Sequence, residues 1–528
     1  MATGGVFQII TNDGKQDRML MATALLNRRL ALIEEARSRD PLVSDSTPTL
    51  LDIEKTHILF MNAHFKPFAA IGYEYNNVKP QSSTSSLGGE VQFSIPQFGD
   101  FFGDICVHAT VTAPTFAKHA SDTEKASGRW CTYPGLRLFQ TVKFDVNGNP
   151  LDQYSCDATA IYNQVMVPPN KRDAWDRCVG QEKPLQGYLP QKDTSYDGTG
   201  TLASHRVGLE IFNGYQTPKP SGSVDNLDVW VPLLFWFNKD PRLVIPSVSI
   251  PHGQRYITLT LATQDQMFQL DANGNDYSPS YSTNCTVSKM EMYINNIFVN
   301  PEVHDIFIKR IGFSLIRVHR EQNQSIQNST DEILLSKMKW PIETMYVGFR
   351  RTSYQTSAAS NDKWHTFHGY NSSNGYSLHG VAAWNGSAAA APPTVTANTP
   401  LRMTSSITIS AHGIPLYNAI DSKFFDSYIP YLYGGQNINA PATAGILMVN
   451  FCIYPGTYQP SSHVNVSRAR EFYLKYVGGL DSDGSTQLIS STYPAQMVIV
   501  ASAINFLLIT DGKNCLCVLV TECKSFCL

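Results

Sequence analysis

The sequence LDVWVPLLFWFNKDPRLVIPSVSIPHGQRYITLTLA occupies residues 227–262 and predicts two strands, a turn and a third strand in succession. Residues 229–237 are almost continuously apolar and aromatic, which is typical of a strand covered on both faces, with Pro232 at an edge or bulge. Residues 256–262 alternate strictly: Ile257, Leu259 and Leu261 share one face, and polar or amphipathic side chains share the other. This period of two indicates a β-barrel core and not a helix.

Length and composition indicate a large β protein. The 528 residues exceed one ordinary domain, and two large all-β domains fit that length best. Aromatic residues make up 11% of the chain, and 35 glycines with 30 prolines supply many turns, whereas charged residues make up only 16%. The formal net charge of −3 argues against a surface that wraps nucleic acid, so we expect no direct contact with a genome.

The cysteines and the apolar runs favour a reducing compartment without a membrane span. No signal-peptide pattern opens the chain. Six of the ten cysteines stand singly, which predicts buried thiols. The longest apolar run, residues 497–509, is shorter than the roughly 20 residues that a transmembrane helix needs and is interpreted as a core strand.

Residues 17–37 form the one convincing helical pattern before the strands begin, with an apolar stripe that includes Leu26 and Leu30. A helix packed on its own domain is the simpler interpretation, and a docking arm for a partner layer is the alternative. From Thr56 onward, short strands alternate with turns, and Asn147-Gly148 predicts a type I′ hairpin. The segment PEVHDIF at Pro301 is interpreted as a short helical connection that marks a domain boundary.

The second half of the chain repeats the pattern of the first. GILMVNFCIY at Gly445 mirrors the strand at Val229, and MVIVASAINFLLI at Met497 mirrors MEMYINNIFV at Met290, each after a little more than two hundred residues. The pattern predicts an all-β fold of two tandem eight-stranded antiparallel sandwiches, a double jelly roll, with an N-terminal helix and long loop insertions. Residues 183–225 and 351–400 are rich in turn-forming and small residues and are predicted to be surface loops.

Candidate chemistry is sparse. DANGND at Asp271 departs from a calcium loop and favours a turn, as do DVNGN at Asp145 and DSDG at Asp481. His365 and His368 have a metal-like spacing but no recognisable second pair of ligands, so no metal, cofactor or catalytic residue is assigned and the protein is expected not to be an enzyme. The clustered C-terminal cysteines match no trusted zinc motif; free thiols are the first interpretation and intermolecular disulfides the alternative: Cys515, Cys517, Cys523 and Cys527.

Long sequence strings resemble one family. NAHFKP at Asn62, IPQFGDFF at Ile95, FDVNGNPLD at Phe144, YINNIFVNPEVH at Tyr293 and YQPSSHVNVSRAREF at Tyr458 occur in this order. Through them the chain resembles the major capsid proteins of nucleocytoplasmic large DNA viruses, most of all the asfarvirus type exemplified by African swine fever virus. The Cys-rich end after Gly512 departs from the family pattern.

The resemblance implies a structural subunit of the virion that forms homotrimers of pseudo-hexagonal outline, tiling an icosahedral shell around an inner membrane. It implies contacts with neighbouring capsomers, minor capsid and penton proteins and inner-membrane-associated viral proteins, possible help from a dedicated folding chaperone, and assembly in the host cytoplasm at a viral factory. The expected divisions are an N-terminal arm and amphipathic helix, a first jelly roll with crown loops at about 183–225, a second with a crown insertion at about 351–400, and a Cys-rich tail: residues 1–55, 56–300, 301–512 and 513–528.

The residues expected to form the structural core come from the strand patterns. They are Phe235, Trp236, Phe237, Ile257, Leu259, Leu261, Tyr293, Phe298, Phe451 and Phe506. The rival function is a carbohydrate-binding or hydrolytic β-sandwich protein, in which loop aromatics would stack on sugars: Trp364, Tyr370, Tyr376 and Trp384.

Overall fold

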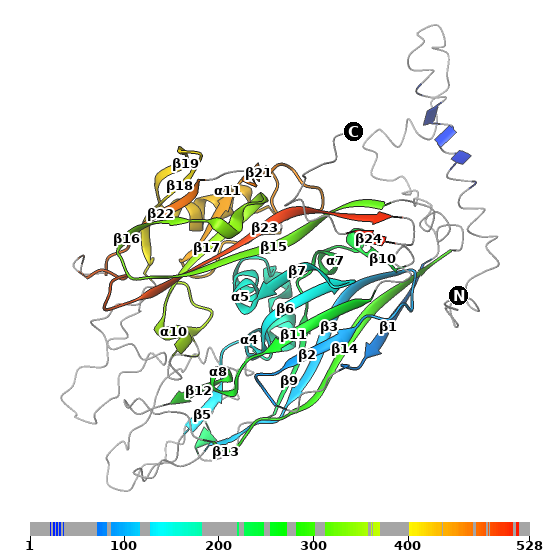
Figure 1. Ribbon diagram of the computed structural model, residues 1–528, viewed down its shortest axis with the longest axis horizontal. Coiled ribbons are helices and arrows are strands. Elements are labelled where there is room, and N and C mark those ends of the chain that lie inside the picture. Colours follow the sequence, from blue (N-terminus) through cyan, green and yellow to red (C-terminus); the bar gives the residue numbers. More distant parts are fainter. Residues whose placement is uncertain are drawn as a thin grey trace, which may run out of the picture.

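Two β-sandwiches lie one above the other in the computed structural model (Figure 1). The structure describes isolated helical positions between residues 22 and 35 and then residues 71–81, 86–116, 127–181, 219–220, 226–247, 254–271, 281–300, 312–356, 361, 363–369, 401–435, 437–467, 471–481, 484, 486–510 and 514–516. Within this part of the chain, no helix is both long and apolar enough to cross a membrane.

The first sandwich pairs a sheet in the order β1-β14-β3-β10, with β9 also on β3, against a sheet in the order β2-β11-β6-β7. All these pairings are antiparallel. The strands of the first sheet are β1 (Ile71–Val78), β3 (Phe101–Val111), β9 (Leu227–Pro232), β10 (Ile245–Pro246) and β14 (Val287–Val299). Those of the second are β2 (Glu90–Ser94), β6 (Phe139–Val146), β7 (Asn149–Ser155) and β11 (Arg255–Leu261).

The second sandwich repeats this order. One sheet runs β15-β23-β17-β20, with β21 beside β17 and β24 beside β23, and the other runs β16-β22-β18-β19. The strands of these sheets are β15 (Gly312–Ile326), β16 (Thr330–Leu334), β17 (Pro341–Arg351), β18 (Thr404–Ala411), β19 (Ile414–Asp421), β20 (Ile446–Asn450), β21 (Val464–Asn465), β22 (Phe472–Gly478), β23 (Ala495–Thr510) and β24 (Asn514–Leu516). In strand order, β1 corresponds to β15, β14 to β23, β3 to β17 and β9 to β20. The repeated sequence pattern predicted two of these correspondences, β14 with β23 and β9 with β20.

Short elements connect the strands. The first half holds α4 (Pro134–Leu138), α5 (Cys156–Val165), η2 (Pro169–Lys171), α6 (Arg172–Cys178), α7 (Trp236–Lys239), η3 (Pro241–Leu243) and α8 (Gln264–Met267). The second half holds η5 (Ser336–Met338), α10 (Ser353–Thr356), η7 (Phe424–Tyr428) and α11 (Ile429–Tyr433). In the minor sheets, β5 (Ser127–Trp130) pairs with both β12 (Phe268–Asp271) and β8 (Lys219–Pro220), and β13 (Tyr281–Thr283) pairs with β4 (Thr115–Phe116).

Several local predictions are confirmed. Asn147 and Gly148 have φ values of 53° and 77°, as a type I′ hairpin between β6 and β7 requires. In β11 the side chains of Ile257, Leu259 and Leu261 are buried at 2% exposure or less. The apolar run at residues 497–509 lies inside the long strand β23.

The strand predicted over residues 229–237 is corrected by the structure. It ends at Pro232, and its exposure alternates, with Trp230 at 39%, so it is not covered on both faces. Proline lacks the N–H that would continue the ladder, and the chain turns into α7. The aromatic run then packs between the sheets: the Phe235 ring lies 5.4 Å from Tyr154, and the Phe237 ring lies 5.6 Å from Phe102.

The predictions for the two chain ends are only partly within the described residues. In the N-terminal helical pattern, Leu25, Leu26 and Leu32 are helical and 57–59% exposed, so at these positions the helix is not packed on its own domain. The strand at His57, the connection at Pro301, most of residues 183–225 and 370–400 and the tail beyond Leu516 lie outside the described residues. Six single cysteines are free, four of them buried and Cys106 and Cys178 half-buried.

Candidate functional site

A polar seam joins the two sandwiches where β7 runs beside β15. Asp152 on β7 accepts a hydrogen bond from the backbone N–H of His319 at 2.8 Å, and its other oxygen lies 2.9 Å from His319 Nδ1. Glu321, two residues after His319 on β15, accepts a hydrogen bond from the backbone N–H of Ser155 at 2.9 Å. Burial is the largest effect on Glu321 and raises the pKa of its carboxyl group. His319 and Glu321, which alternate along β15, therefore hold this strand of the second sandwich at a fixed position along β7 of the first.

Helix α5 begins in the seam and carries a buried ion pair. Ser155 caps the helix by accepting a hydrogen bond from Asp157 N. Asp157 in the first turn receives two hydrogen bonds from the Arg350 guanidinium on β17, at 2.6 and 3.0 Å, and the two residues are 4% and 2% exposed. Arg350 also donates to Gln496 at 2.8 Å. A bidentate pair of this kind holds the start of α5 on the second sandwich with a defined orientation.

A second set of contacts corrects the prediction that residues 351–400 begin as a surface insertion. Asn361 is 3% exposed and donates to the backbone oxygens of Asp265 and Phe268, at 2.6 and 2.7 Å. Arg137, 1% exposed, donates back to Asn361 O at 2.7 Å. Trp364 is also 1% exposed and donates from Nε1 to Thr132 O at 2.6 Å. Residues 361–368, here called the wedge, lie between the sandwiches, because Asn361 and Trp364 donate to the first and the Phe367 ring packs on Gly348 of the second.

The wedge contains Trp364 of the carbohydrate hypothesis and both histidines of the metal-like spacing. Trp364 is not accessible to a sugar, whereas the other loop aromatics of the carbohydrate hypothesis lie outside the described residues. His365 and His368 are held without charge, since burial lowers their pKa values to about 3 and about 4. Among the residues that the structure describes, no group of three metal-ligating side chains forms. The His-rich motif thus packs between the sandwiches.

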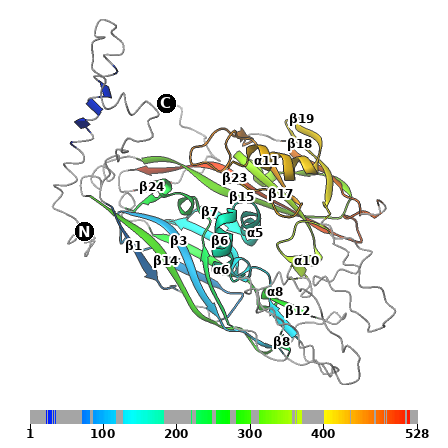
Figure 2. The same cartoon turned by 180° about the vertical axis from the view of Figure 1, so that it is seen from behind.

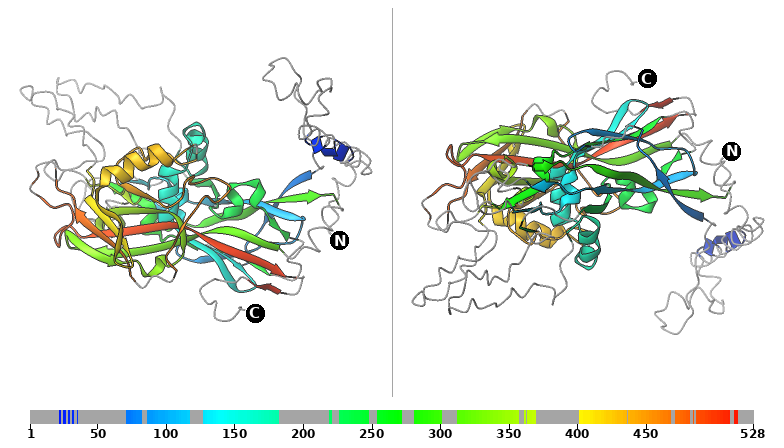
Figure 3. Two further views of the ribbon diagram at one scale, coloured as in Figure 1. Left: turned by 90° about the horizontal axis from the view of Figure 1, so that it is seen from above. Right: turned by 90° about the horizontal axis from the view of Figure 1, so that it is seen from below.

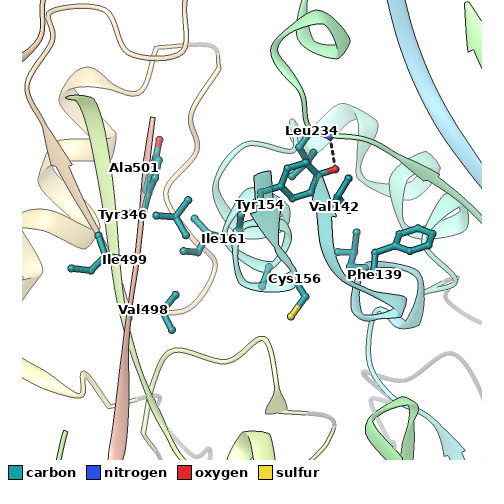
Figure 4. Close-up of a cluster of buried hydrophobic side chains, with 14 of the residues drawn as sticks. Phe139, Val142, Tyr154, Cys156, Ile161, Leu234, Tyr346, Val498, Ile499 and Ala501 are labelled. Atoms are coloured by element: carbon teal, nitrogen blue, oxygen red, sulfur yellow. Dashed lines mark hydrogen bonds between the residues drawn. The ribbon is translucent and has the colours of Figure 1, made fainter. Parts of the chain in front are cut away.

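Apolar contacts continue the interface beside the polar seam (Figure 4). Ile161 and Cys156 of α5 lie opposite Tyr346 and Val498, on the face of the β15-β23-β17-β20 sheet that points away from its own sandwich core. Tyr346 is 2% exposed and Val498 is fully buried. The interface between the sandwiches therefore combines a sealed apolar centre with hydrogen-bonded charges.

The described residues also include two groups of exposed aromatic side chains. On the outer face of the β1-β14-β3-β9 sheet, Tyr73, Tyr75 and Trp230 are 53%, 57% and 39% exposed. At the opposite sandwich, η7 and α11 expose Tyr428, Tyr431, Leu432 and Tyr433 at 49%, 84%, 51% and 38%. Large aromatic and aliphatic side chains at such exposure are typical of surfaces that bind another protein.

The ten expected core residues fall into two groups. Phe235, Trp236, Phe237, Ile257, Leu259 and Leu261 are at most 3% exposed. Tyr293, Phe298, Phe451 and Phe506 are half-buried. Tyr293 is on the outer face of its sheet, 4.9 Å from the Trp230 ring, because the alternation along β14 sends Met292 and Ile294 inward instead.

Sequence reasoning missed the residues that join the sandwiches, above all Asp157, Arg350 and Asn361. The Ser155-x-Asp157 pattern before an apolar segment is a helix N-terminus signal and predicts the start of α5. No sequence signal identifies Arg350 as the partner, since 193 residues separate the two charges.

Comparison with known proteins assigns the family. Residues 72–300 match the family described as "Major capsid protein N-terminus", and residues 297–514 match "Large eukaryotic DNA virus major capsid protein". Hexon protein p72 of African swine fever virus is 34% identical to this chain, over 97% of this chain and 99% of that protein. The chain belongs to the major capsid proteins of large eukaryotic DNA viruses.

Solved structures agree with this assignment to the major capsid proteins. The Faustovirus major capsid protein has a TM-score of 0.67 and 34% identity, and the match covers 94% of this chain and all of that one. A structure of the PBCV-1 virus capsid has a TM-score of 0.61 at 18% identity, with 86% and 98% coverage, and supports the double jelly roll fold alone. As a major capsid protein the chain is a structural, asfarvirus-like component of the virion that assembles with copies of itself.

Proposed function

We propose that three copies of this major capsid protein form a pseudo-hexameric capsomer, and that these capsomers tile an icosahedral shell around an inner membrane. The observation that carries the proposal is the duplication inside one chain: two sandwiches with the same strand order, joined by a buried seam. Three such chains present six similar edges, so a trimer packs on its neighbours like a hexagon. The exposed aromatic surfaces at opposite sandwiches supply contact area for this assembly.

We also propose the division of labour along the chain. Pro301 separates the jelly rolls; the strands of the first lie within residues 71–299 and those of the second within 312–516. The N-terminal arm lies at the capsomer base, and the loops at 183–225 and at 370–400, after the wedge, form the crown. The alignment with hexon protein p72 runs over 651 positions, more than the 528 residues of this chain, so that protein carries segments absent here. We therefore expect a lower and plainer crown.

The proposal extends to partners and place of assembly. Minor capsid and penton proteins and inner-membrane-associated viral proteins would contact the capsomer, with no direct contact to nucleic acid. Assembly would take place in the host cytoplasm, with a dedicated chaperone assisting the slow long-range β pairing.

Light scattering coupled to size-exclusion chromatography of the purified full chain, followed by negative-stain imaging, tests the central proposal. The expected result is a mass of three chains and particles with a hexagonal outline. A stable, folded monomer at all accessible concentrations would contradict it.

A further inference from the structure

The first sandwich has a gap along one edge of β3. β9 pairs with residues 106–111 of β3 and β10 with residues 101–102, so residues 103–105 have no partner on that side among the described strands. Beside the gap lies a hollow of about 390 Å³, a size that suits a small molecule. Its walls include Tyr162 of α5 and Trp175 of α6. Figure 2 shows α6 beside α5, and α6 is the teal helix at the flank of the molecule in both views of Figure 3.

A β-bulge in β3 places a carboxylate at this hollow. The ladder between β14 and β3 shifts register between residues 294 and 296 of β14, where β3 has one residue more. Asp104 lies in this bulge and lines the hollow. Its two oxygens accept hydrogen bonds from the Tyr75 hydroxyl at 2.9 Å and from Asn295 Nδ2 at 2.8 Å. Among the described residues, neither oxygen contacts a cation.

The second sandwich has the same bulge, and there the carboxylate is neutralised. β17 carries Glu343 at its register shift against β23. Arg317 on β15 donates to both oxygens of Glu343, at 2.6 and 3.2 Å, and pairs in the ladder with Ile504. The matching position of β1, paired with Ile297 of β14, is Tyr73. The first sandwich therefore has a carboxylate and an aromatic ring where the second has a carboxylate and a guanidinium.

Two amide groups of the hollow also favour a ligand that donates hydrogen bonds. Asn295, which is 9% exposed, and Asn238 both line the hollow. Their Nδ2 atoms donate to Asp104 at 2.8 Å and to Ile105 O at 2.7 Å, respectively. Their Oδ1 atoms accept no hydrogen bond from the part of the chain that the structure describes. A buried acceptor without a donor is costly, so a bound donor would be favoured here.

The other charged groups that line the hollow have counter-charges. The ammonium group of Lys239 is attracted by the carboxylates of Asp152 and Glu343. Asp240 forms a bidentate contact with Arg242, at 2.9 and 2.7 Å. Within the described residues, the bulge carboxylate of β3 is therefore the charge of the hollow that lacks a counter-charge.

We propose that this hollow binds a small organic cation, an alkylammonium or guanidinium group on an apolar body, in the place that the Arg317 guanidinium fills in the second sandwich. The charged group bonds to Asp104, with the two amide oxygens as further acceptors. The ring of Tyr73 offers it a cation–π contact, and the apolar body packs on Tyr162 and Trp175. The site goes beyond the proposed capsomer and does not depend on the number of copies in it.

Phenethylamine is the probe for this site, and 2-phenylethanol, which has a similar shape without the charge, is its control. Calorimetric titration of the purified full chain should show a Kd for the amine of about 0.1–1 mM, as expected for so few atoms, and about tenfold weaker binding of the alcohol. Asp104→Asn should weaken binding of the amine at least about tenfold. The matched control is Asp228→Asn, which alters a carboxylate that is 62% exposed and outside the lining of the hollow, and should leave the affinity unchanged.

Tyr73→Arg supplies the missing side chain in place of a ligand. Its guanidinium should pair with Asp104 as Arg317 pairs with Glu343, and should therefore raise the melting temperature and abolish binding of phenethylamine. Tyr73→Leu removes the ring without adding a charge, so it should keep part of the affinity.

Protection of Cys106 reports on the site without any substitution. Cys106 lines the hollow, and burial together with the charge of Asp104 raises its pKa to about 11, so N-ethylmaleimide should label it slowly. Phenethylamine should slow this labelling further and leave Cys178, a half-buried thiol outside the lining, unaffected. Equal binding of amine and alcohol, an unchanged affinity in Asp104→Asn, or no protection of Cys106 would each overturn the site.

Discussion

Asp157 and Arg350, 193 residues apart in the sequence, form a bidentate ion pair buried between the two sandwiches, with N–O distances of 2.6 and 3.0 Å. Asp157 lies in the first turn of α5 in the first sandwich, and Arg350 projects from β17 in the second. Removing two charges from water is costly unless both are fully paired, so each partner depends on the other. The pair therefore favours one relative orientation of the two sandwiches.

Breaking this pair on one side should destabilise the chain strongly. In Arg350→Met the Asp157 carboxylate stays buried without its partner, and we expect a loss of about 3–5 kcal/mol in the free energy of unfolding. The double variant Asp157→Ala with Arg350→Met should lose clearly less than the sum of the single variants, as urea unfolding at fixed protein concentration will show.

A half-exposed pair provides the comparison for this cycle. Lys143 and Asp145 are joined at 3.0 Å, with side chains 40% and 10% exposed, so Lys143→Ala should cost less than Arg350→Met. Strict additivity in the Asp157 and Arg350 cycle would show that the two charges do not depend on each other.

Truncation of Trp236 tests the aromatic packing that begins where β9 ends. Trp236 is 3% exposed and its ring lies 5.2 Å from Phe237, so Trp236→Ala should cost roughly 3–5 kcal/mol of folding stability. Trp230→Ala is the matched control, because Trp230 is 39% exposed and should cost the isolated chain much less. Equal melting temperatures for Trp236→Ala and wild type would show that Trp236 does not contribute to the core.

Individual strands of both sandwiches could be predicted because alternation is a local signal. Ile257, Leu259 and Leu261 identify a half-buried strand by themselves, and the Asn147-Gly148 turn predicts the hairpin of β6 and β7. The continuous apolar run through Phe235 led to the wrong prediction of a strand. A run without polar residues has no period, so it does not distinguish a covered strand from a turn that places three aromatic rings between two sheets.

The contacts between the sandwiches could not be predicted in the same way. Asn361 and Trp364 stand in a polar, turn-rich segment, and local composition indicates a surface loop there. Their burial depends on Arg137 and Thr132, more than two hundred residues earlier. These contacts form between two folded sandwiches, and no short stretch of the sequence contains both partners.

Gly348 should tolerate no side chain. It lies in the middle of β17, and an added Cβ would overlap three ring carbons of Phe367, whose segment packs on the sheet at this point. Gly348→Ala should therefore cost about 1–3 kcal/mol, since the ring cannot move away without lifting the wedge. Adding Phe367→Leu should recover part of the loss in thermal unfolding; no difference between Gly348→Ala and wild type would show that the wedge moves freely.

Acidification should weaken the wedge through its histidines. His365 and His368 remain neutral in the fold, with pKa values lowered to about 3 and about 4 by burial, whereas the unfolded chain binds protons below about 6.5. Stability is therefore complete above pH 6.5 and falls as the pH drops toward 4. At pH 5 each histidine should cost about 2 kcal/mol. Chemical unfolding between pH 7 and 5 measures this slope.

The pH dependence of the unfolding free energy distinguishes the contribution of the two histidines from that of the Glu321 carboxyl group. The double variant His365→Asn with His368→Asn should be less stable at pH 7 but should show a flatter dependence between pH 7 and 5. Glu321 acts with the opposite sign: its raised pKa makes the folded chain bind a proton more readily, so acidification relieves a penalty there. Glu321→Gln should consequently steepen the loss of stability toward pH 5. An unchanged slope in the histidine variant would mean that the wedge opens before its histidines are protonated.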